Sequence, residues 1–143
     1  MSLQFQKIRD LIIDNNLKIV RSHRTIITYK EAELFYEEHK EKFFYNRLLT
    51  FMCSGPSDIH ILADHNAIAK WRQLMGPTKV YQAQYIAPDT IRGMYGLSDT
   101  RNATHGSGIL SNLCFRLCYL CVIRNNCSFR FSCISGERNK HIL

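Results

Sequence analysis

The sequence predicts an α+β domain in which helices pack against one face of a small antiparallel sheet. Apolar residues recur at helical spacing in some stretches and alternate with polar residues in others, in the order helix, strand, helix pair, strand, helix, strand. Neither an internal repeat nor a Pro/Ser-rich linker divides these stretches. A chain of 143 residues is long enough to bury an ordinary hydrophobic core.

The expected elements have clear start and stop signals. In order, they are a helix ended by Asn15-Asn16, a half-buried strand over 17–27, a helix opened by the capping box Thr28-x-x-Glu31, and a helix over 42–53 that Gly55-Pro56 stops. They continue as a strand over 57–63 with one more buried face, a helix over 65–75, an irregular stretch over 78–89, a short helical turn after Pro88-Asp89-Thr90 and a last strand that holds His105.

The net charge favours an anionic partner. The formal charge is +7, which is typical of proteins that meet nucleotides, nucleic acid or an acidic surface. Residues 109–143 hold five basic residues and a single acidic one, Glu137. Because so much of the excess lies in this last stretch, nucleic-acid binding is not favoured.

The composition indicates a globular protein with neither a membrane span nor a secretory signal. Hydrophobic residues make up 45% of the chain and charged residues 22%. The longest apolar window, 109–123, is shorter than the ~18 residues of a span and contains Asn112 and Arg116. The first residues lack the apolar core of a secretory signal, so we expect a reducing compartment and no disulfide framework.

Cysteines gather in residues 109–143, whose composition differs from that of the preceding chain. Five of the six cysteines lie there: Cys114, Cys118, Cys121, Cys127 and Cys133. We therefore divide the chain into a domain over 1–108 and a Cys-rich basic tail over 109–143. Cys118-x-x-Cys121 is half of a metal-binding motif, but no second CxxC follows, so no metal ligands are predicted.

One short motif concentrates the chemistry of the chain, Asn102-x-x-His105-Gly106-Ser107. A histidine in a polar turn is by itself more often structural than functional. Imidazole also serves as a base, a metal ligand or a nucleophile, and the nearby Arg92 and Arg101 suit a phosphate-rich site. His105 is therefore the candidate nucleophile.

This motif resembles the signature of the nucleoside diphosphate kinases, in which the histidine takes up a phosphoryl group. The resemblance extends from Ile8 to Ser107 and is greatest to the type-six branch of the family. The segments that carry it are Pro88-Asp89-Thr90-Ile91-Arg92-Gly93 and Leu97-Ser98-Asp99-Thr100-Arg101-Asn102. It implies a ferredoxin-like antiparallel sheet with helices on one face.

The resemblance also implies a role for each candidate side chain. Each of these residues alone is more often plain core or solvated surface, and only their joint occurrence in order favours a site. The implied roles are phosphoryl acceptance by His105, base stacking by Phe44 with Leu48 beside it, phosphate binding by Arg72, Arg92 and Thr78, ribose binding by Asn102, and support of the histidine by Tyr36 and Ser107.

The implied reaction is a ping-pong transfer of a γ-phosphoryl group from a nucleoside triphosphate to a nucleoside diphosphate. A covalent phosphohistidine divides the transfer into two halves. Mg²⁺ would arrive on the nucleotide phosphates, so no protein metal site is expected. The implied partners are the nucleotides themselves and either further copies of the chain or another protein.

The chain departs from the family at both ends of the resemblance. The family opens with a central apolar strand that ends in Lys-Pro-Asp, whose lysine contacts the phosphates, and that tripeptide does not occur here. Gly108 replaces an aspartate, and no glutamate-bearing helix follows. We therefore expect a chain that starts after the first strand and ends in unrelated sequence. As an alternative, the apolar stretch 113–123 fills the vacant position.

These departures leave a second function open. A catalytically weak or silent module that binds nucleotides or a protein partner would keep the same residues. The type-six resemblance favours that option, and it implies a mitochondrial or cytoplasmic location.

Overall fold

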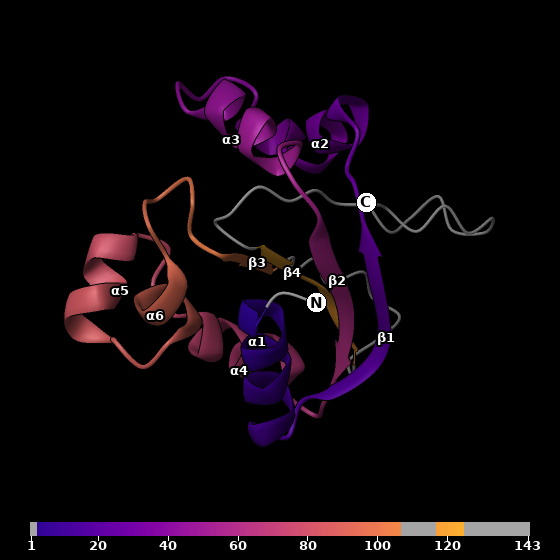
Figure 1. The fold of residues 1–143 in the computed structure, drawn as a ribbon, viewed down its shortest axis with the longest axis vertical. Coiled ribbons are helices and arrows are strands. Elements are labelled where there is room, and N and C mark those ends of the chain that lie inside the picture. The colour runs from indigo at the N-terminus through magenta and orange to yellow at the C-terminus, as the bar shows by residue number, and fades with distance from the viewer. Residues whose placement is uncertain (1–2, 107–116, 125–143) are drawn as a thin grey trace.

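The computed structural model describes residues 3–106 and 117–124, in which a four-stranded antiparallel sheet carries helices on one face (Figure 1). The strands are β1 (Lys18–Thr25), β2 (Ser57–Ala63), β3 (Thr104–Gly106) and β4 (Leu117–Arg124), in the spatial order β1-β2-β4-β3. This arrangement confirms the predicted α+β, ferredoxin-like class.

Helices α1 and α4 cover one face of the sheet, and the α2–α3 pair lies at one end of it (Figure 1). α5 and α6 pack against each other on the far side of α4 from the sheet. The helices are α1 (Leu3–Asp14), α2 (Tyr29–Phe35), the 3-10 turn η1 (Glu37–His39), α3 (Tyr45–Met52), α4 (Ala67–Met75), α5 (Val80–Ile86) and α6 (Ile91–Tyr95). None of these helices is long and apolar enough to cross a membrane.

The predicted capping box at the start of α2 is present. The Thr28 hydroxyl accepts a hydrogen bond from Glu31 N at 3.3 Å, and the Glu31 carboxylate accepts one from Thr28 N at 2.8 Å. A cap of this kind stabilises a helix by about 1 kcal/mol. It fixes the point at which the chain leaves β1 and turns into the helices at that end of the sheet.

Two hydrophobic clusters form the core, one beneath α1 and one around α2 and α3. Beneath α1, apolar side chains of the helix pack on Leu62 of β2 and Trp71 of α4. Around α2 and α3, Tyr36 and Met52 pack on Ile59 of β2. Because adjacent strand residues point to opposite faces, Ile59 and Leu62 belong to different clusters.

The vacancy that the resemblance predicts at the centre of the sheet is filled from the C-terminal side. β4 lies between β2 and β3, with Val122 opposite Ile59 on one side and opposite His105 on the other. The alternative interpretation of the apolar stretch 113–123 is therefore confirmed, with the strand beginning at Leu117. Its backbone pairs with both neighbours, so neither β2 nor β3 presents a free edge there.

The predicted irregular stretch 78–89 was wrong, because it contains helix α5. Only Val80 and Ala83 of this helix are buried, whereas Tyr81 and Tyr85 are about 80% exposed. With so few buried positions, the helix gives no clear periodic signal of apolar residues in the sequence. Its start depends on a distant group, since the Asp99 carboxylate accepts a hydrogen bond from Val80 N at 3.0 Å.

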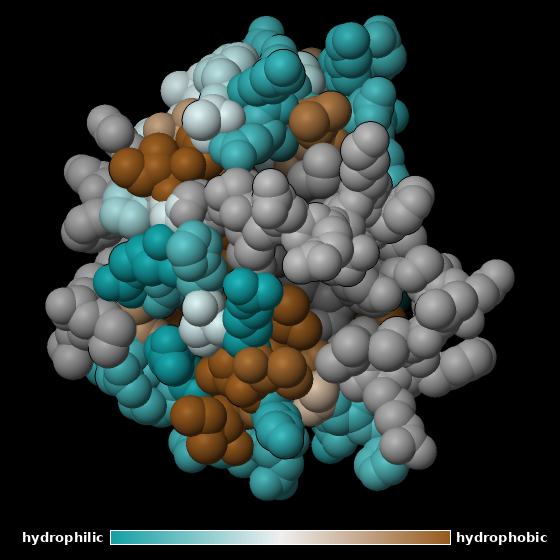
Figure 2. All heavy atoms as spheres, turned by 90° about the vertical axis from the view of Figure 1, so that its right-hand side faces the viewer, coloured by the Kyte–Doolittle hydropathy of each residue, from teal (hydrophilic) through white to brown (hydrophobic). Residues whose placement is uncertain are grey.

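The side of the molecule that carries β1 mixes hydrophilic surface with separate hydrophobic patches (Figure 2). β1 exposes Val20 next to charged residues, and Ile26 is also exposed just after the strand. The strand is therefore more exposed than the half-buried strand that the sequence predicts, since only Thr25 is buried and Ile19 partly buried.

β2 has one face more buried than the other, as predicted, but that face carries Asp58, His60 and Leu62. Asp58 and His60, which alternate with Ile59, are also buried. Asp58 accepts two hydrogen bonds from Arg24 at 2.6 and 2.7 Å, and the Arg24 guanidinium stacks on the ring of Phe5 in α1. Arg24 lies on the neighbouring strand, so the pattern within β2 does not reveal it. Its hydrogen bonds to Asp58 allow this polar face of the strand to be buried.

Burial lowers the pKa of His60 to about 4, so this histidine is neutral in the folded protein near pH 7. Its Nδ1 lies 2.8 Å from the Ser22 hydroxyl of β1. The unfolded chain takes up a proton near pH 6.5, whereas the folded chain resists it down to about pH 4. His60 therefore leaves the free energy of unfolding unchanged above pH 6.5 and lowers it as the pH falls from about 6.5 to about 4.

We expect His60→Gln to reduce the acid sensitivity of the fold. Between pH 7 and pH 4.5, the free energy of unfolding of the parent chain should fall by about 2–3 kcal/mol through His60 alone. Urea unfolding at the two pH values measures this loss, and the variant should show a smaller one. The exposed His65, changed to Gln, is the matched control. Equal acid losses in the His60 variant and the parent would contradict this origin of the sensitivity.

Candidate functional site

A cleft of about 800 Å³ opens between the α2–α3 end of the sheet, the end of α4 and the loop that leads into β3. Eight of the nine predicted site residues line it: Tyr36, Phe44, Leu48, Arg72, Thr78, Arg92, Asn102 and His105. The ninth, Ser107, lies outside the described residues. Residues that are up to 69 positions apart in the sequence, from Tyr36 to His105, thus meet in one cavity.

The backbone before His105 makes a sharp turn. Ala103 is buried and has a positive φ of 67°, a conformation uncommon for residues other than glycine, and Thr104 N donates to Asn102 O at 2.8 Å. The short strand β3 then begins. The turn sends Asn102 and His105 toward the same cleft although they are three residues apart.

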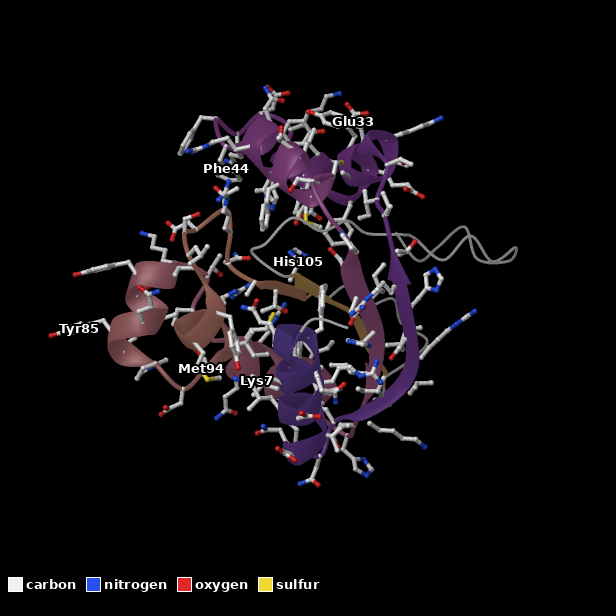
Figure 3. The ribbon with its side chains drawn as sticks, in the orientation of Figure 1. Lys7, Glu33, Phe44, Tyr85, Met94 and His105 are labelled. Atoms are coloured by element: carbon white, nitrogen blue, oxygen red, sulfur yellow. The ribbon has the colours of Figure 1, made fainter. Side chains whose placement is uncertain are left out.

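Gly106 and His105 point to opposite sides of β3. A Cβ at Gly106 would lie 2.5 Å from the indole Nε1 of Trp71, so only glycine allows this approach to α4. The His105 ring instead contacts Phe35 and Tyr36, with ring centroids 4.8 and 5.8 Å away. Figure 3 shows His105 between β3 and the α2–α3 end of the molecule. The His-Gly pair therefore places the imidazole in the cleft and β3 against α4.

The surroundings of His105 keep its imidazole neutral. Burial, and then electrostatic interaction with Arg92 and His39, lower the pKa of His105 to about 4. Near pH 7 one ring nitrogen therefore carries an unprotonated lone pair. A neutral imidazole beside a buried guanidinium is suited to attack an electrophile that carries negative charge.

Arg92 joins three segments around the cleft. Its side chain is 6% exposed, and its Nη1 and Nη2 donate to the carbonyl oxygens of Gly76 and Thr104 at 2.8 and 3.2 Å. Within the described part of the chain its Nε has no hydrogen-bond partner. The guanidinium therefore links the end of α4 to β3, with its buried Nε–H left unpaired among the described residues.

Phe44 and Leu48 form the apolar end of the cleft. Leu48 N donates to Phe44 O at 3.0 Å, which places the two residues one helical turn apart. The Phe44 ring lies 5.8 Å from the ring of His39 and 5.4 Å from that of Phe43, and Phe43 is 88% exposed. A planar aromatic ligand has several rings on which to stack here.

The cleft also contains residues that the sequence analysis missed. His39, Arg47, Lys79 and Asp99 all line it. Arg47 precedes Leu48 in the sequence, and Lys79 follows Thr78. This adjacency to predicted site residues is the sequence signal that could have identified them. Among the described residues, no group of three or more His, Cys, Asp or Glu side chains is placed to bind a metal ion.

We expect Arg92→Lys to destabilise the fold by about 2 kcal/mol, because an ammonium cannot reproduce the forked bonds to Gly76 and Thr104. Arg72 is the matched control, since it lies in the same cleft but is exposed. Thermal unfolding of Arg72→Lys should be unchanged. Equal unfolding temperatures for the parent and Arg92→Lys would show that Arg92 does not tie the segments together.

Comparisons with known proteins agree with the motif. A family model described as nucleoside diphosphate kinase matches residues 2–116. Nucleoside diphosphate kinase 6 of Homo sapiens is 48% identical over 105 residues, which cover 73% of this chain and 56% of that protein. The Xenopus tropicalis protein of the same name is 46% identical over 109 residues, or 76% and 61%. The chain thus spans between half and two thirds of the length of these relatives.

Solved structures show the same fold. The nucleoside diphosphate kinase of Aquifex aeolicus aligns with a TM-score of 0.68 and 34% identity, covering 70% of this chain and 71% of that one. The enzyme of Halobacterium salinarum, solved in complex with CDP, aligns with a TM-score of 0.68 and 33% identity, covering 76% and 69%. On the combined evidence of motif, cleft, sequence and fold, the chain belongs to the nucleoside diphosphate kinase family.

Proposed function

We propose that this chain transfers the γ-phosphoryl group of a nucleoside triphosphate to a nucleoside diphosphate through a phosphohistidine at His105. The observation that carries the proposal is the neutral His105 imidazole beside the buried Arg92 in a nucleotide-sized cleft. Family membership supports the same chemistry.

In the first half-reaction, the unprotonated nitrogen of His105 attacks the γ-phosphorus. The bond from that phosphorus to the bridging oxygen breaks, and the nucleoside diphosphate leaves with the electron pair. In the second half-reaction an oxygen of another nucleoside diphosphate attacks the phosphohistidine, and the electron pair returns to the imidazole. Because both halves use the same cleft, the cations around it serve both.

The other residues of the cleft would hold the nucleotide. Arg92 and Arg72 would place positive charge on the phosphate oxygens, with Thr78 as a hydroxyl donor. Asn102 would hold the ribose, and Phe44 and Leu48 the base. Tyr36 would support His105, as would Ser107. Mg²⁺ carried on the nucleotide would neutralise part of the phosphate charge.

A second candidate is a nucleotide-binding module with little or no transfer activity. Within the described part of the chain, His105 makes ring contacts but no hydrogen bond that would fix its orientation. A nucleophile that no partner orients spends less time in the attacking geometry. Binding would then persist while the transfer rate falls.

Incubation with ATP labelled at the γ-phosphorus distinguishes the two functions. We expect acid-labile, alkali-stable label on the protein, and its complete loss in His105→Ala. The exposed His65, changed to Ala, should keep the label. Unchanged label in His105→Ala would contradict the proposal, whereas absence of label with intact nucleotide binding would favour the silent module.

The pH dependence of labelling tests the lowered pKa of His105. We expect the initial rate of labelling to stay level from pH 8 to pH 6 and to fall toward pH 4 as the imidazole takes up a proton. Rapid quenching into alkali preserves the phosphohistidine, and circular dichroism at each pH confirms that the chain is folded. A midpoint near pH 6.5 would show that the imidazole is not perturbed.

A further inference from the structure

A buried histidine of β2 keeps one ring nitrogen without a hydrogen-bond partner. His60 is 0% exposed, and its Nδ1 lies 2.8 Å from the Ser22 hydroxyl of β1. Within the described part of the chain, its Nε2 has no hydrogen-bond partner. When Nδ1–H donates to that hydroxyl, the lone pair of the neutral ring is on Nε2. A buried polar atom of this kind calls for a partner such as an ion.

Two cysteines of β4 occupy register positions next to this histidine. Cys121 is the β4 partner of His60, and Cys118 is the partner of Leu62, two positions further along β2. Residues directly opposite each other in an antiparallel pair share a face of the sheet. His60 and Leu62 also share a face, because they are two residues apart. The register therefore puts both cysteines on the face that carries His60.

An irregularity in the pairing of β2 with β4 makes this placement possible. Residues three apart in a regular strand lie on opposite faces. Between His60 and Leu62, however, a single residue of β2 stands opposite two residues of β4. The extra residue has the form of a β-bulge and brings Cys118 and Cys121 to one face. A Cys-x-x-Cys pair that a regular strand would divide is thereby collected on one side of the sheet.

The same face carries a second buried polar atom without a partner. Gly106 of β3 is the other register partner of Cys121, and a Cβ on Gly106 would lie 2.5 Å from Trp71 Nε1. Among the described residues, Trp71 Nε1 has no hydrogen-bond acceptor. An indole N–H only donates, and metal-bound ligands commonly accept hydrogen bonds from their surroundings. An unsatisfied imidazole nitrogen and an unsatisfied donor thus lie on either side of the register position of Cys121.

We propose that His60, Cys118 and Cys121 bind a zinc ion between β2 and β4. Zn²⁺ takes thiolate sulfur and imidazole nitrogen as ligands in a tetrahedral arrangement, which leaves one position for a further ligand. Cross-strand neighbours have Cβ atoms about 4.5–5.5 Å apart, a span that an ion with ligand bonds of about 2.0–2.3 Å bridges. The hydrogen bond between Ser22 and Nδ1 would fix the ring orientation of His60, as partners of metal-binding histidines commonly do.

The charge of this ligand set suits a buried position. Two thiolates balance the charge of Zn²⁺, so the site buries no uncompensated charge. Burial lowers the pKa of His60 to about 4, so near pH 7 no proton competes with the ion for its nitrogen. The described side chains include no cluster of three such ligands, and the two cysteines join His60 through the register of β4. The ion would link β4 to β2 and so hold the strand that pairs with β3.

Titration of the full chain with Co²⁺ tests this site, after a chelator has removed bound metal and in a reductant that is not itself a thiol. We expect one equivalent of Co²⁺ to give the visible bands of tetrahedral cobalt and a thiolate charge-transfer band in the near ultraviolet. Zn²⁺ should abolish both by displacing the cobalt. Cys118→Ser and Cys121→Ser should each remove the tetrahedral spectrum.

His60→Gln is the decisive variant, because it distinguishes this site from metal binding by cysteines alone. The affinity for Co²⁺ should fall by at least about 100-fold, since loss of a partner that only supports a ligand costs about 10–100-fold. Ser22→Ala, which keeps all three ligands, should weaken binding about tenfold. Cys127→Ser is the matched control and should keep both the spectrum and the affinity. Circular dichroism of each metal-free variant should match that of the parent.

The outcomes bear on the zinc site by itself. Absence of the charge-transfer band in the parent chain, or an unchanged Co²⁺ affinity in His60→Gln, would overturn it. Loss of the spectrum in Cys127→Ser as complete as in Cys121→Ser would assign the ion to other cysteines and overturn it as well. Phosphoryl transfer through His105 does not depend on any of these results.

Discussion

The hydrogen bonds of the Arg92 guanidinium are the interaction on which the cleft depends. They join the last turn of α4 at Gly76 to β3 at Thr104, and so fix the two walls between which His105 lies. The same buried cation is a cause of the lowered pKa of His105, after burial itself. A single side chain thus contributes both to the shape of the site and to the protonation state of its histidine.

The sheet behind this site is completed in an unexpected order. β4 follows β3 in the chain but lies inside the sheet, between β2 and β3. β2 therefore gains a hydrogen-bonded neighbour on each side, and His105 sits on a strand that is paired rather than free. The contacts that position His105 consequently come from two ends of the sequence, from α2 on one side and from the segment after β3 on the other.

The cleft collects polar side chains from separate segments of the chain. His105, Arg92 and Asn102 line it from β3, α6 and the loop before β3, and Arg47 and Asp99 line it from α3 and the same loop. Arg47 and Asp99 each contact a neighbour of their own, Phe43 and Val80. The site is therefore assembled by tertiary structure rather than by one stretch of sequence.

The sequence by itself determined the elements whose signals are local: the capping box at Thr28 and Glu31, the glycine-proline stops, and the motif from Asn102 to Gly106 that marks the site. Those signals depend on residues close in the chain, so periodicity and turn chemistry reveal them. Only the tertiary structure decided what depends on distant partners. The start of α5 needs the carboxylate of Asp99, burial of Asp58 needs Arg24 on the neighbouring strand, and the place of β4 follows from the backbone groups that β2 and β3 leave open.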